Sequence, residues 1–237
     1  MIAFKGWART SLIDFPGHIA TVLFTGSCNF RCPMCHNAEL VLHPDERSDL
    51  ADDAVRNFLE KRVGKVTGVV ISGGEPTLQP DLQSFAMWVQ DLGYAVKLDT
   101  NGYQPDALAD LLDSDSIDFV AMDVKAPPAK YARLAGLNRV EIERIEKSLA
   151  LLTASGTSVE YRTTVVPRLL DVDDIEALAR WVSARCGDGV PYVLQQFRGL
   201  NTLDPTLADA PPLDVSVLRE MKERAGRWLT NVKLRGV

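Results

Sequence analysis

Three cysteines close together form the most chemically distinctive segment of the chain. Cys28, Cys32 and Cys35 have the spacing C-x₃-C-x₂-C, and Gly26 precedes them where the backbone could turn sharply. Thiolates are the usual protein ligands of iron–sulfur clusters. Three thiolates can hold three irons of a four-iron cube, and the fourth iron then stays open, much as catalytic zinc keeps one free position. The segment therefore predicts a [4Fe–4S] cluster with one open iron.

Two other interpretations of this loop stay open from the loop alone, namely zinc binding and plain buried thiols. Structural zinc normally takes four ligands. Cys186 is the only other cysteine, although His18, His36 or His43 could supply the missing ligand. A disulfide framework does not suit such crowding, and clustered cysteines in a reducing compartment more often bind metal. We interpret Cys186 as a structural thiol, and His18 and His43 as surface or capping residues.

Chemically unusual residues also lie at the carboxyl ends of three apolar runs farther along the chain. Ser72-Gly73-Gly74-Glu75-Pro76 combines two glycines, which allow close backbone approach, with a carboxylate that can accept hydrogen bonds from an ammonium group. The other two sets are Asp99, Thr100 and Asn101, and Asp123, Val124 and Lys125. Two aspartates facing one pocket would repel each other unless a cation lay between them.

The elements that must position these residues alternate between short strands and helices. Six β-branched or apolar runs predict buried strands at 19–25, 67–72, 95–100, 117–124, 158–166 and 191–197. Helical periodicity is evident at 82–92, 142–152, 175–181 and 218–228. This alternation predicts an α/β fold with a parallel sheet and outer helices. Parallel sheets bind ligands at the carboxyl ends of their strands, where the cysteine loop and the polar sets fall.

The chain shows no internal repeat and no composition shift that marks a linker. The proline-rich stretch 198–212 is interpreted as a surface loop before the last helix. We therefore expect one domain over 1–237, with a core at about 17–200 and a C-terminal helix at about 213–229.

Composition excludes several classes of function. The 237 residues are 46% hydrophobic and 24% charged, which is ordinary for a globular protein. The net charge of −6 argues against nucleic acid and anionic membranes as partners. No apolar run approaches the roughly 20 residues that span a bilayer. The first residues lack the pattern of a secretory signal, so the cytoplasm is the expected location.

Several segments together carry a resemblance to a known family. They are SLIDFPGHIATVLFTGSC, CNFRCPMCHN, GGEPTLQ, LDTNG and DVKAP, within about residues 5–200. The chain resembles the radical S-adenosylmethionine (SAM) superfamily and, within it, the activating enzymes of glycyl radical proteins. It is most similar to the activating proteins of anaerobic ribonucleoside-triphosphate reductase, with the pyruvate formate-lyase activating enzymes nearby. The resemblance implies a partial (β/α)₆ barrel of the TIM type.

The resemblance also implies roles for individual residues. A [4Fe–4S] cluster would be held by Cys28, Cys32 and Cys35. Residues implied to bind SAM are Met34, His36, Gly73, Gly74, Glu75, Thr100, Asn101, Val124, Lys125, Arg162 and Gln195. Asp99 and Asp123 are implied to hold a monovalent cation.

Two positions depart from the family's pattern. Met34 stands where an aromatic residue usually precedes the third cysteine, and the polarizable thioether could keep an apolar contact with adenine. Gln195 or Gln196 stands where the pyruvate formate-lyase relative has a histidine, and glutamine cannot act as an acid at neutral pH.

The implied chemistry is reductive cleavage of SAM. A flavodoxin or ferredoxin would supply the electron, and a 5′-deoxyadenosyl radical would remove the Cα hydrogen of a glycine in a partner enzyme, with no catalytic side chain beyond the cluster and SAM. The short chain without a second cysteine cluster agrees with an activating enzyme, as do six strands, which would leave a barrel laterally open. The alternatives are a radical SAM enzyme for a small molecule or for another glycyl radical enzyme such as pyruvate formate-lyase, and, more remotely, a non-catalytic metal-binding module.

Overall fold

A computed structural model describes residues 2–237, which divide into two compact units. The first unit contains the described residues up to Asn29, together with Glu39–Thr100 and Asp106–Ala121. The second unit contains Phe30–Ala38, Asn101–Pro105 and Met122–Val237. Each unit is described below by itself.

The first unit is built on four strands whose order along the chain is also their order in the sheet. They are β1 (Phe4–Ser11), β2 (Ala20–Thr25), β3 (Gly68–Gly73) and β4 (Ala95–Thr100). β1 runs antiparallel to β2, whereas β2, β3 and β4 are parallel, with Val22 opposite Val70 and Val70 opposite Lys97. Val69, Val70 and Ile71 are fully buried, as expected for a strand covered on both faces.

Short helices connect these strands. They are α1 (Ala38–Leu42), η1 (Pro44–Glu46), α2 (Asp52–Glu60), η2 (Pro76–Leu78), α3 (Leu82–Asp91) and α4 (Pro105–Asp113). α3 packs against β4 and ends just before Gly93, whose φ of +88° is the left-handed conformation that glycine tolerates. The chain passes from the first unit to the second within β5 (Phe119–Asp123).

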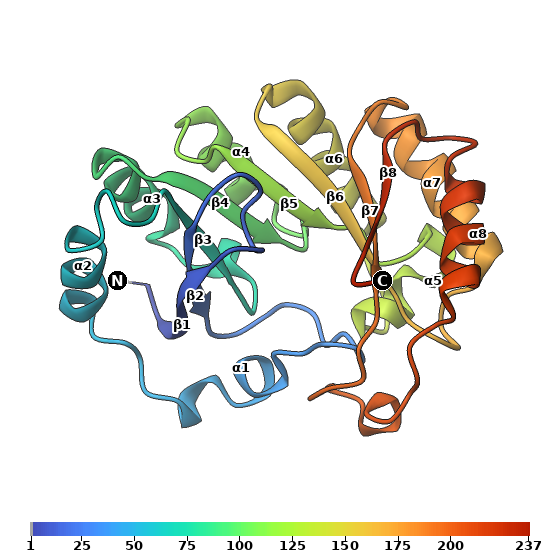
Figure 1. Ribbon diagram of the computed structural model, residues 1–237, viewed down its shortest axis with the longest axis horizontal. Helices are drawn as coiled ribbons and strands as arrows, with labels where there is room; N and C mark the ends of the chain where they lie inside the picture. The colour runs from blue at the N-terminus through green and yellow to red at the C-terminus, as the bar shows by residue number, and fades with distance from the viewer. Residues whose placement is uncertain (1) are drawn as a thin grey trace. The chain divides into compact units, whose positions relative to one another are not determined.

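The second unit repeats the pattern with three parallel strands. They are β6 (Ser158–Val165), β7 (Tyr192–Gln196) and β8 (Val232–Arg235). Its helices are α5 (Pro128–Ala135), α6 (Ile142–Ser155), α7 (Val172–Cys186), η3 (Pro205–Leu207) and α8 (Val215–Ala225). α7 and α8 lie side by side, with α8 against β7 and β8 (Figure 1).

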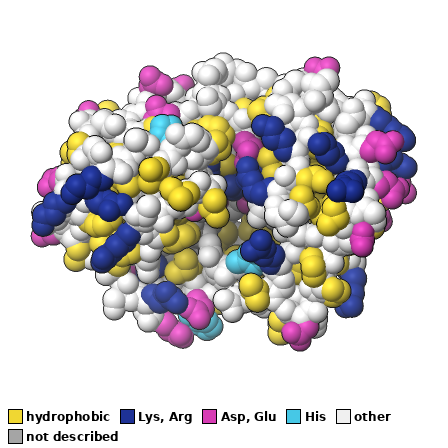
Figure 2. All heavy atoms as spheres, viewed as in Figure 1, with side chains coloured by type: hydrophobic (Ala, Val, Ile, Leu, Met, Phe, Trp, Pro, Cys, Tyr) yellow, Lys and Arg dark blue, Asp and Glu magenta, His cyan; other side chains and the backbone are white. Residues whose placement is uncertain are grey.

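Local sequence signals explain where the helices of the second unit begin and end. Asp171 and Asp174 form a capping box at the start of α7, in which each side chain accepts a hydrogen bond from the backbone N–H of the other. Gly156 follows α6 in the left-handed conformation. Over α7 and α8, basic and acidic side chains lie next to one another (Figure 2), and Arg224 of α8 pairs with Glu176 and Asp173 of α7.

The predicted α/β class is confirmed, because each unit combines parallel strands with connecting helices. All six predicted strands are present. The predicted core of about 17–200 omitted β1 and β8, which pair with β2 and β7. The predicted C-terminal helix was too long, since α8 is capped at its start by Asp214 and stops before Gly226. Within residues 2–237, no helix is long and apolar enough to cross a bilayer.

Candidate active site

The cysteine loop is anchored in the second unit by Phe30, which stands between the first two cysteines. Phe30 is 1% exposed, and its ring lies 5.1 Å from the ring of Tyr103 and 6.5 Å from that of Tyr131, measured between centroids. Buried aromatic contacts of this kind fix a loop more firmly than exposed turn residues do. Phe30 therefore determines where the chain enters the segment that carries Cys32 and Cys35.

Two backbone hydrogen bonds hold the positions on either side of Cys32. The N–H of Arg31 donates to the carbonyl of Ala135 at the end of α5, over 2.8 Å. The N–H of Asp204 donates to the carbonyl of Pro33, over 2.9 Å. Gly136 makes the first contact possible, because a Cβ at Gly136 would stand 1.8 Å from the carbonyl oxygen of Arg31. The loop is thus held between α5 and the 198–212 segment.

The three cysteines of the loop differ in exposure. Cys32 is buried, whereas Cys28 and Cys35 are partly exposed. The N–H of Cys35 donates to the carbonyl of Cys32 over 3.0 Å, which closes a tight turn between these two cysteines. Cys28 belongs to the first unit, and the chain itself limits its distance from Cys32 to about 14 Å.

Burial controls the protonation of two of the thiols. It raises the pKa of Cys32 to about 11 and also raises the pKa of Cys35, while the charge of Lys125 acts in the opposite direction on both. A buried thiolate therefore needs a cationic partner, which iron provides. Two thiols on a firmly held segment, with Cys28 four residues before the first of them in the sequence, fit an iron–sulfur cluster by the chemistry of their donor set. Within residues 2–237, no three His, Cys, Asp or Glu side chains already converge as a metal-ligand group.

The two residues expected near adenine occupy different environments. Met34 is buried. His36 is exposed, its Nε2 lies 2.7 Å from the carbonyl oxygen of Arg198, and its ring stacks near Phe197 with a centroid separation of 6.2 Å. His36 therefore ties the end of the cysteine loop to the segment after β7, and its contact with adenine stays a prediction.

The double glycine after β3 lies against the segment that leads into the cysteine loop. The N–H of Gly74 donates to the carbonyl of Thr25 over 2.9 Å, and the N–H of Glu75 donates to that of Ser27 over 2.8 Å. A Cβ at Gly73 would stand 2.3 Å from the nitrogen of Thr25, and one at Gly74 would stand 1.8 Å from the oxygen of Ser27. Close approach at these positions therefore requires glycines, and the group approached in this structure is the chain's own backbone, while the contact of Gly73 and Gly74 with SAM stays a prediction.

Glu75 is a buried connector between two strand ends. The side chain is 1% exposed, and its Oε1 accepts hydrogen bonds from the N–H and hydroxyl of Thr77 and from the hydroxyl of Thr100, the last over 2.8 Å. These bonds join the turn after β3 to the end of β4. Glu75 and Thr100, two predicted SAM-binding residues, are thus brought together, and their contact with SAM stays a prediction.

Asp99 pairs with a lysine that the sequence argument overlooked. Lys97 lies on the same strand, is 2% exposed, binds the carboxylate of Asp99, and lies over the ring of Phe119 at 6.0 Å. A single lysine within the apolar run AVKLDT was the signal available in the sequence. A buried lysine normally requires such a partner.

Asp123 is held by two cations of the second unit. Its Oδ1 lies 2.8 Å from Nε of Arg162, and its Oδ2 lies 2.9 Å from Nζ of Lys125. Burial alone would raise the pKa of Asp123, but Arg162 and Lys125 hold it well below its usual range. The pKa of Lys125 is raised by the same partner against the effect of burial. Because Asp99 and Asp123 each have their own cation, repulsion between them no longer argues for a bound monovalent cation, which stays a prediction.

Two further predicted SAM-binding residues are used by the fold itself. Val124 is fully buried, its N–H donates to the carbonyl of Arg162 over 2.8 Å, and its carbonyl accepts from the hydroxyl of Thr163 over 2.7 Å. Asn101 is 5% exposed and its Oδ1 accepts from the N–H of Tyr103 over 2.9 Å. Val124 and Asn101 therefore fix strand ends, and their roles toward SAM stay predictions.

The structure distinguishes between the two glutamines at the end of β7. The side-chain amide of Gln196 is buried and bonds both backbone groups of Leu213, donating to its carbonyl over 2.7 Å and accepting from its N–H over 3.2 Å. Gln195 points to the other face of the strand and is partly exposed. Gln195 is therefore the better placed of the two to meet a ligand.

The remaining candidates each have a contact of their own in the structure. Cys186 is buried at the end of α7, with Sγ 4.0 Å from the carbonyl oxygen of Leu149. His18 contacts Thr67, and His43 pairs with Glu46 on the surface. The predicted structural or surface roles of these three residues agree with their surroundings.

Comparison with known proteins gives the family. The sequence model of the Radical SAM superfamily matches residues 22–182 of this chain. The chain belongs to the radical SAM superfamily. The predicted resemblance is thereby confirmed, and radical SAM enzymes use a [4Fe–4S] cluster and SAM. Cys28, Cys32 and Cys35 fit the C-x₃-C-x₂-C motif of these enzymes.

Full-length relatives place the chain more narrowly among radical SAM proteins. It is 33% identical to a protein of Methanocaldococcus jannaschii assigned as a glycyl-radical enzyme activating enzyme, over 98% of this chain and 95% of the relative. It is 26% identical to the pyruvate formate-lyase-activating enzyme of Clostridium pasteurianum, over 92% of each chain. The chain is therefore an enzyme of the radical SAM oxidoreductase class and groups with the glycyl-radical enzyme activating enzymes.

A solved structure agrees in fold. A radical SAM methyltransferase from Sphaerobacter thermophilus aligns with a TM-score of 0.70 at 15% identity, over 95% of this chain and 68% of the other. At this identity the likeness shows the radical SAM type of fold alone.

Proposed function

We propose that this radical SAM enzyme generates a glycyl radical on a partner enzyme, and that the partner is an anaerobic ribonucleoside-triphosphate reductase. The observation that carries the activating role is the likeness, over almost the whole chain, to relatives named for that role. The absence of any cysteine besides Cys186 outside the loop also agrees, because it leaves no ligand set for a second cluster.

The choice of partner rests on the segments SLIDFPGHIATVLFTGSC, CNFRCPMCHN, GGEPTLQ, LDTNG and DVKAP, which together resemble the glycyl radical activating enzymes and most of all the reductase-activating group. A specific observation supports a second candidate, pyruvate formate-lyase, because an activating enzyme of that protein aligns over 92% of its own length. Both partners would present a glycine to the same chemistry. They are therefore distinguished by which protein carries the radical.

In this proposal the chain holds its cofactors with residues already described. Cys28, Cys32 and Cys35 would ligate the cluster, and the contacts of Phe30 and Gly136 would keep the loop in place. When bound, the cluster and SAM supply reductive cleavage of SAM and the removal of a hydrogen atom. The protein's own task is to position these groups and to exclude water.

The strand ends would supply the contacts to SAM. The backbone of Gly73 and Gly74 and the carboxylate of Glu75 would receive its ammonium group, since acceptors are what an ammonium group needs. Lys125 and Arg162 carry positive charge that would suit its carboxylate. Gln195 would contribute a neutral hydrogen bond. A flavodoxin or ferredoxin would deliver the electron, and the cytoplasm is the proposed location.

The decisive experiment is an anaerobic incubation of the reconstituted enzyme with SAM, a reductant and each candidate partner, followed by electron paramagnetic resonance. A glycyl radical doublet is expected on the reductase, together with 5′-deoxyadenosine. Replacing Cys28, Cys32 or Cys35 by Ala should abolish SAM cleavage, whereas Cys186→Ala should retain it and serves as the matched control.

Three results would contradict parts of the proposal. A radical on pyruvate formate-lyase alone would replace the partner but keep the activating role. Formation of 5′-deoxyadenosine with a radical on neither protein would favour a small-molecule substrate. Retained cleavage in a variant of Cys32 would overturn the ligand assignment.

A further inference from the structure

A hollow in the second unit lies directly against the cysteine loop. Its volume is about 630 Å³, and Arg31 and Pro33, which flank Cys32 in the sequence, form part of its wall. The other walls come from the end of α5, from the segment after β6 and from the 203–207 turn. The feature is outside the residues predicted to bind SAM, so the proposed function does not yet account for it.

The charge of this hollow is opposite to that of the whole chain. Arg31, Arg133 and Arg168 line it and are exposed, while the chain carries a net charge of −6. The one lining carboxylate, Asp204, accepts hydrogen bonds from the N–H and hydroxyl of Thr206. A local cluster of arginines on an acidic protein creates a field that steers an acidic partner to one place.

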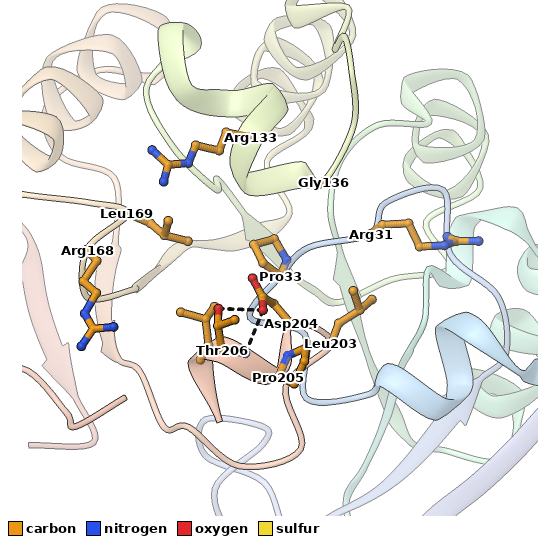
Figure 3. A pocket seen from close by; sticks show the side chains of 11 residues that line it. Arg31, Pro33, Arg133, Gly136, Arg168, Leu169, Leu203, Asp204, Pro205 and Thr206 are labelled. Atoms are coloured by element: carbon orange, nitrogen blue, oxygen red, sulfur yellow. Dashed lines mark hydrogen bonds between the residues drawn. The ribbon is translucent and has the colours of Figure 1, made fainter. Parts of the chain in front are cut away.

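The arrangement of the arginines suits an extended surface better than a small anion. Figure 3 shows Arg133 and Arg168 on one side of the hollow and Arg31 on the other, with its guanidinium directed away from those of the first two. Cations that converge would bind one phosphate, whereas cations spaced along a surface meet separate acidic groups. Arg133 and Arg168 lie together on one wall (Figure 3), and Nη1 of Arg31 donates to the carbonyl of Phe30 over 2.9 Å at the other side. Pro33, Leu169 and Leu203 supply apolar surface between them, as at the centre of a protein interface.

The backbone conformation of one residue that lines the hollow gives a second indication of a functional surface. Arg168 has φ +67°, the left-handed conformation that non-glycine residues rarely adopt. Such strain is retained where surrounding structure imposes it, and it often occurs at binding sites. Here the strained residue places one of the three guanidinium groups.

We propose that this hollow is the docking surface of an acidic electron-carrier protein. The inference rests on the proposed function, since only a cluster on the cysteine loop gives the carrier an acceptor. A carrier seated here contacts the residues on both sides of Cys32, which brings its redox group close to the cluster ligands. A glycine-bearing segment would instead have to reach SAM at the strand ends.

Charge reversal tests the proposal without touching the cluster or SAM residues. The variants are Arg133→Glu, Arg168→Glu and the double variant, with Arg219→Glu on the exposed face of α8 as the matched control. The probe is an acidic flavodoxin. Its binding to the reconstituted enzyme is measured by calorimetry at about 0.01 M and about 0.5 M salt, where screening differs strongly.

The double variant is expected to bind flavodoxin about tenfold or more weakly at low salt, and to slow cluster reduction by flavodoxin similarly. SAM cleavage driven by dithionite, which needs no docking, should remain at the wild-type rate. Arg219→Glu should change neither measurement. Arg133→Gln and Arg168→Gln should give smaller losses, and circular dichroism checks that every variant is folded.

Three results would overturn the inference, and a fourth would refute the proposed function alone. Unchanged flavodoxin affinity in the double variant would exclude this surface, as would an equal loss in Arg219→Glu. A loss of glycyl radical formation with dithionite, at unchanged flavodoxin binding, would assign the hollow to the radical-accepting partner. In the fourth result, the wild-type enzyme binds flavodoxin in a salt-dependent way but forms no 5′-deoxyadenosine. This result would leave the docking surface intact and refute the proposed function instead.

Discussion

Gly136 packs so closely on Arg31 that no other residue fits between helix α5 and the cysteine loop. A Cβ on Gly136 would stand 1.8 Å from the carbonyl oxygen of Arg31 and 2.4 Å from its carbonyl carbon, and the glycine has φ +66°. Both neighbours are backbone, so neither can move aside cheaply. This contact links the end of one helix to the segment that carries Cys32.

Gly136→Ala should therefore lower stability and reduce cluster retention. The left-handed conformation costs an alanine about 1 kcal/mol, and the backbone clash should bring the total to about 2–4 kcal/mol. Urea unfolding and iron per chain after anaerobic reconstitution measure the two effects. The matched control is Gly156→Ala, because Gly156 also follows a helix with φ +74° but a Cβ there would meet no atom within 4 Å. Equal losses in both variants would show that the contact with Arg31 is unimportant.

Thr100→Val tests whether the connection between β3 and β4 prepares the SAM site. The change keeps the shape of the side chain and removes the hydroxyl that donates to Oε1 of Glu75 over 2.8 Å. Losing this buried hydrogen bond should cost about 1–2 kcal/mol in unfolding free energy and weaken SAM binding measured by calorimetry. The control is Thr153→Val on α6, whose hydroxyl donates to the carbonyl of Leu149 in its own helix. Unchanged SAM affinity in a destabilised Thr100→Val would restrict the bond to a structural role.

Alanine variants of the two adjacent glutamines of β7 should separate an effect on SAM binding from an effect on the free energy of unfolding. Gln195→Ala is expected to raise the Kd for SAM with little change in unfolding free energy. Gln196→Ala should cost about 1–3 kcal/mol, because it leaves the partly buried N–H and carbonyl of Leu213 without the side-chain amide that bonds them. Calorimetric SAM titration and urea unfolding on both variants are the measurements. The reverse pattern would assign the ligand contact to Gln196.

Glu146 should make a contribution to the stability of the second unit that is lost at acidic pH. The hydrogen bond from Trp181, with Arg185 beside it, lowers the pKa of Glu146 below its ordinary value. A lowered pKa in the folded state means that the contribution is complete above the unfolded pKa of about 4.3. It is lost as pH falls further, toward the folded pKa.

Glu146→Gln is thus expected to be less stable than the wild type at pH 7 by about 1 kcal/mol and equally stable near pH 3, measured as the difference between paired urea titrations. Glu143→Gln is the control on the same helix, because Glu143 lies in the first turn of α6. A difference between wild type and Glu146→Gln that grows as pH falls would contradict the assignment.

Much of the fold could be predicted because its signals are local. β-branched runs marked the six inner strands, and the carboxyl-end rule indicated where Gly73, Thr100 and Asp123 would lie. β1 was missed because FKGWARTS interrupts its apolar pattern with a glycine and two basic residues. β8 was missed because four residues are too few to show alternation.

The supports of the candidate site could not be predicted in the same way. The contacts of Phe30 with Tyr103 and of Arg31 with Gly136 join residues more than 70 positions apart. No local pattern encodes such pairs. The prediction that Cys32 is a cluster ligand rests on the cysteine spacing together with the family resemblance, whereas its surroundings depend on tertiary structure. The pairing of Asp99 with Lys97 had a local signal, since two residues on one strand share a face.

The 198–212 segment has the proline-rich composition of a surface loop, and the length and sequence of such loops usually vary among relatives. In this protein the backbone N–H of Asp204, near the middle of the segment, donates to the carbonyl of Pro33. The side chain of Gln196 donates to the carbonyl of Leu213, just beyond the end of the segment. A Cβ at Gly199 would also meet the carbonyl oxygens of Ala208 and Leu207 at 2.6 and 2.7 Å, so the segment folds back on itself. Shortening this segment, or replacing it with the corresponding segment of a relative, would therefore alter a support of the cysteine loop. We expect such chimeras to lose oxygen tolerance before their melting temperature falls.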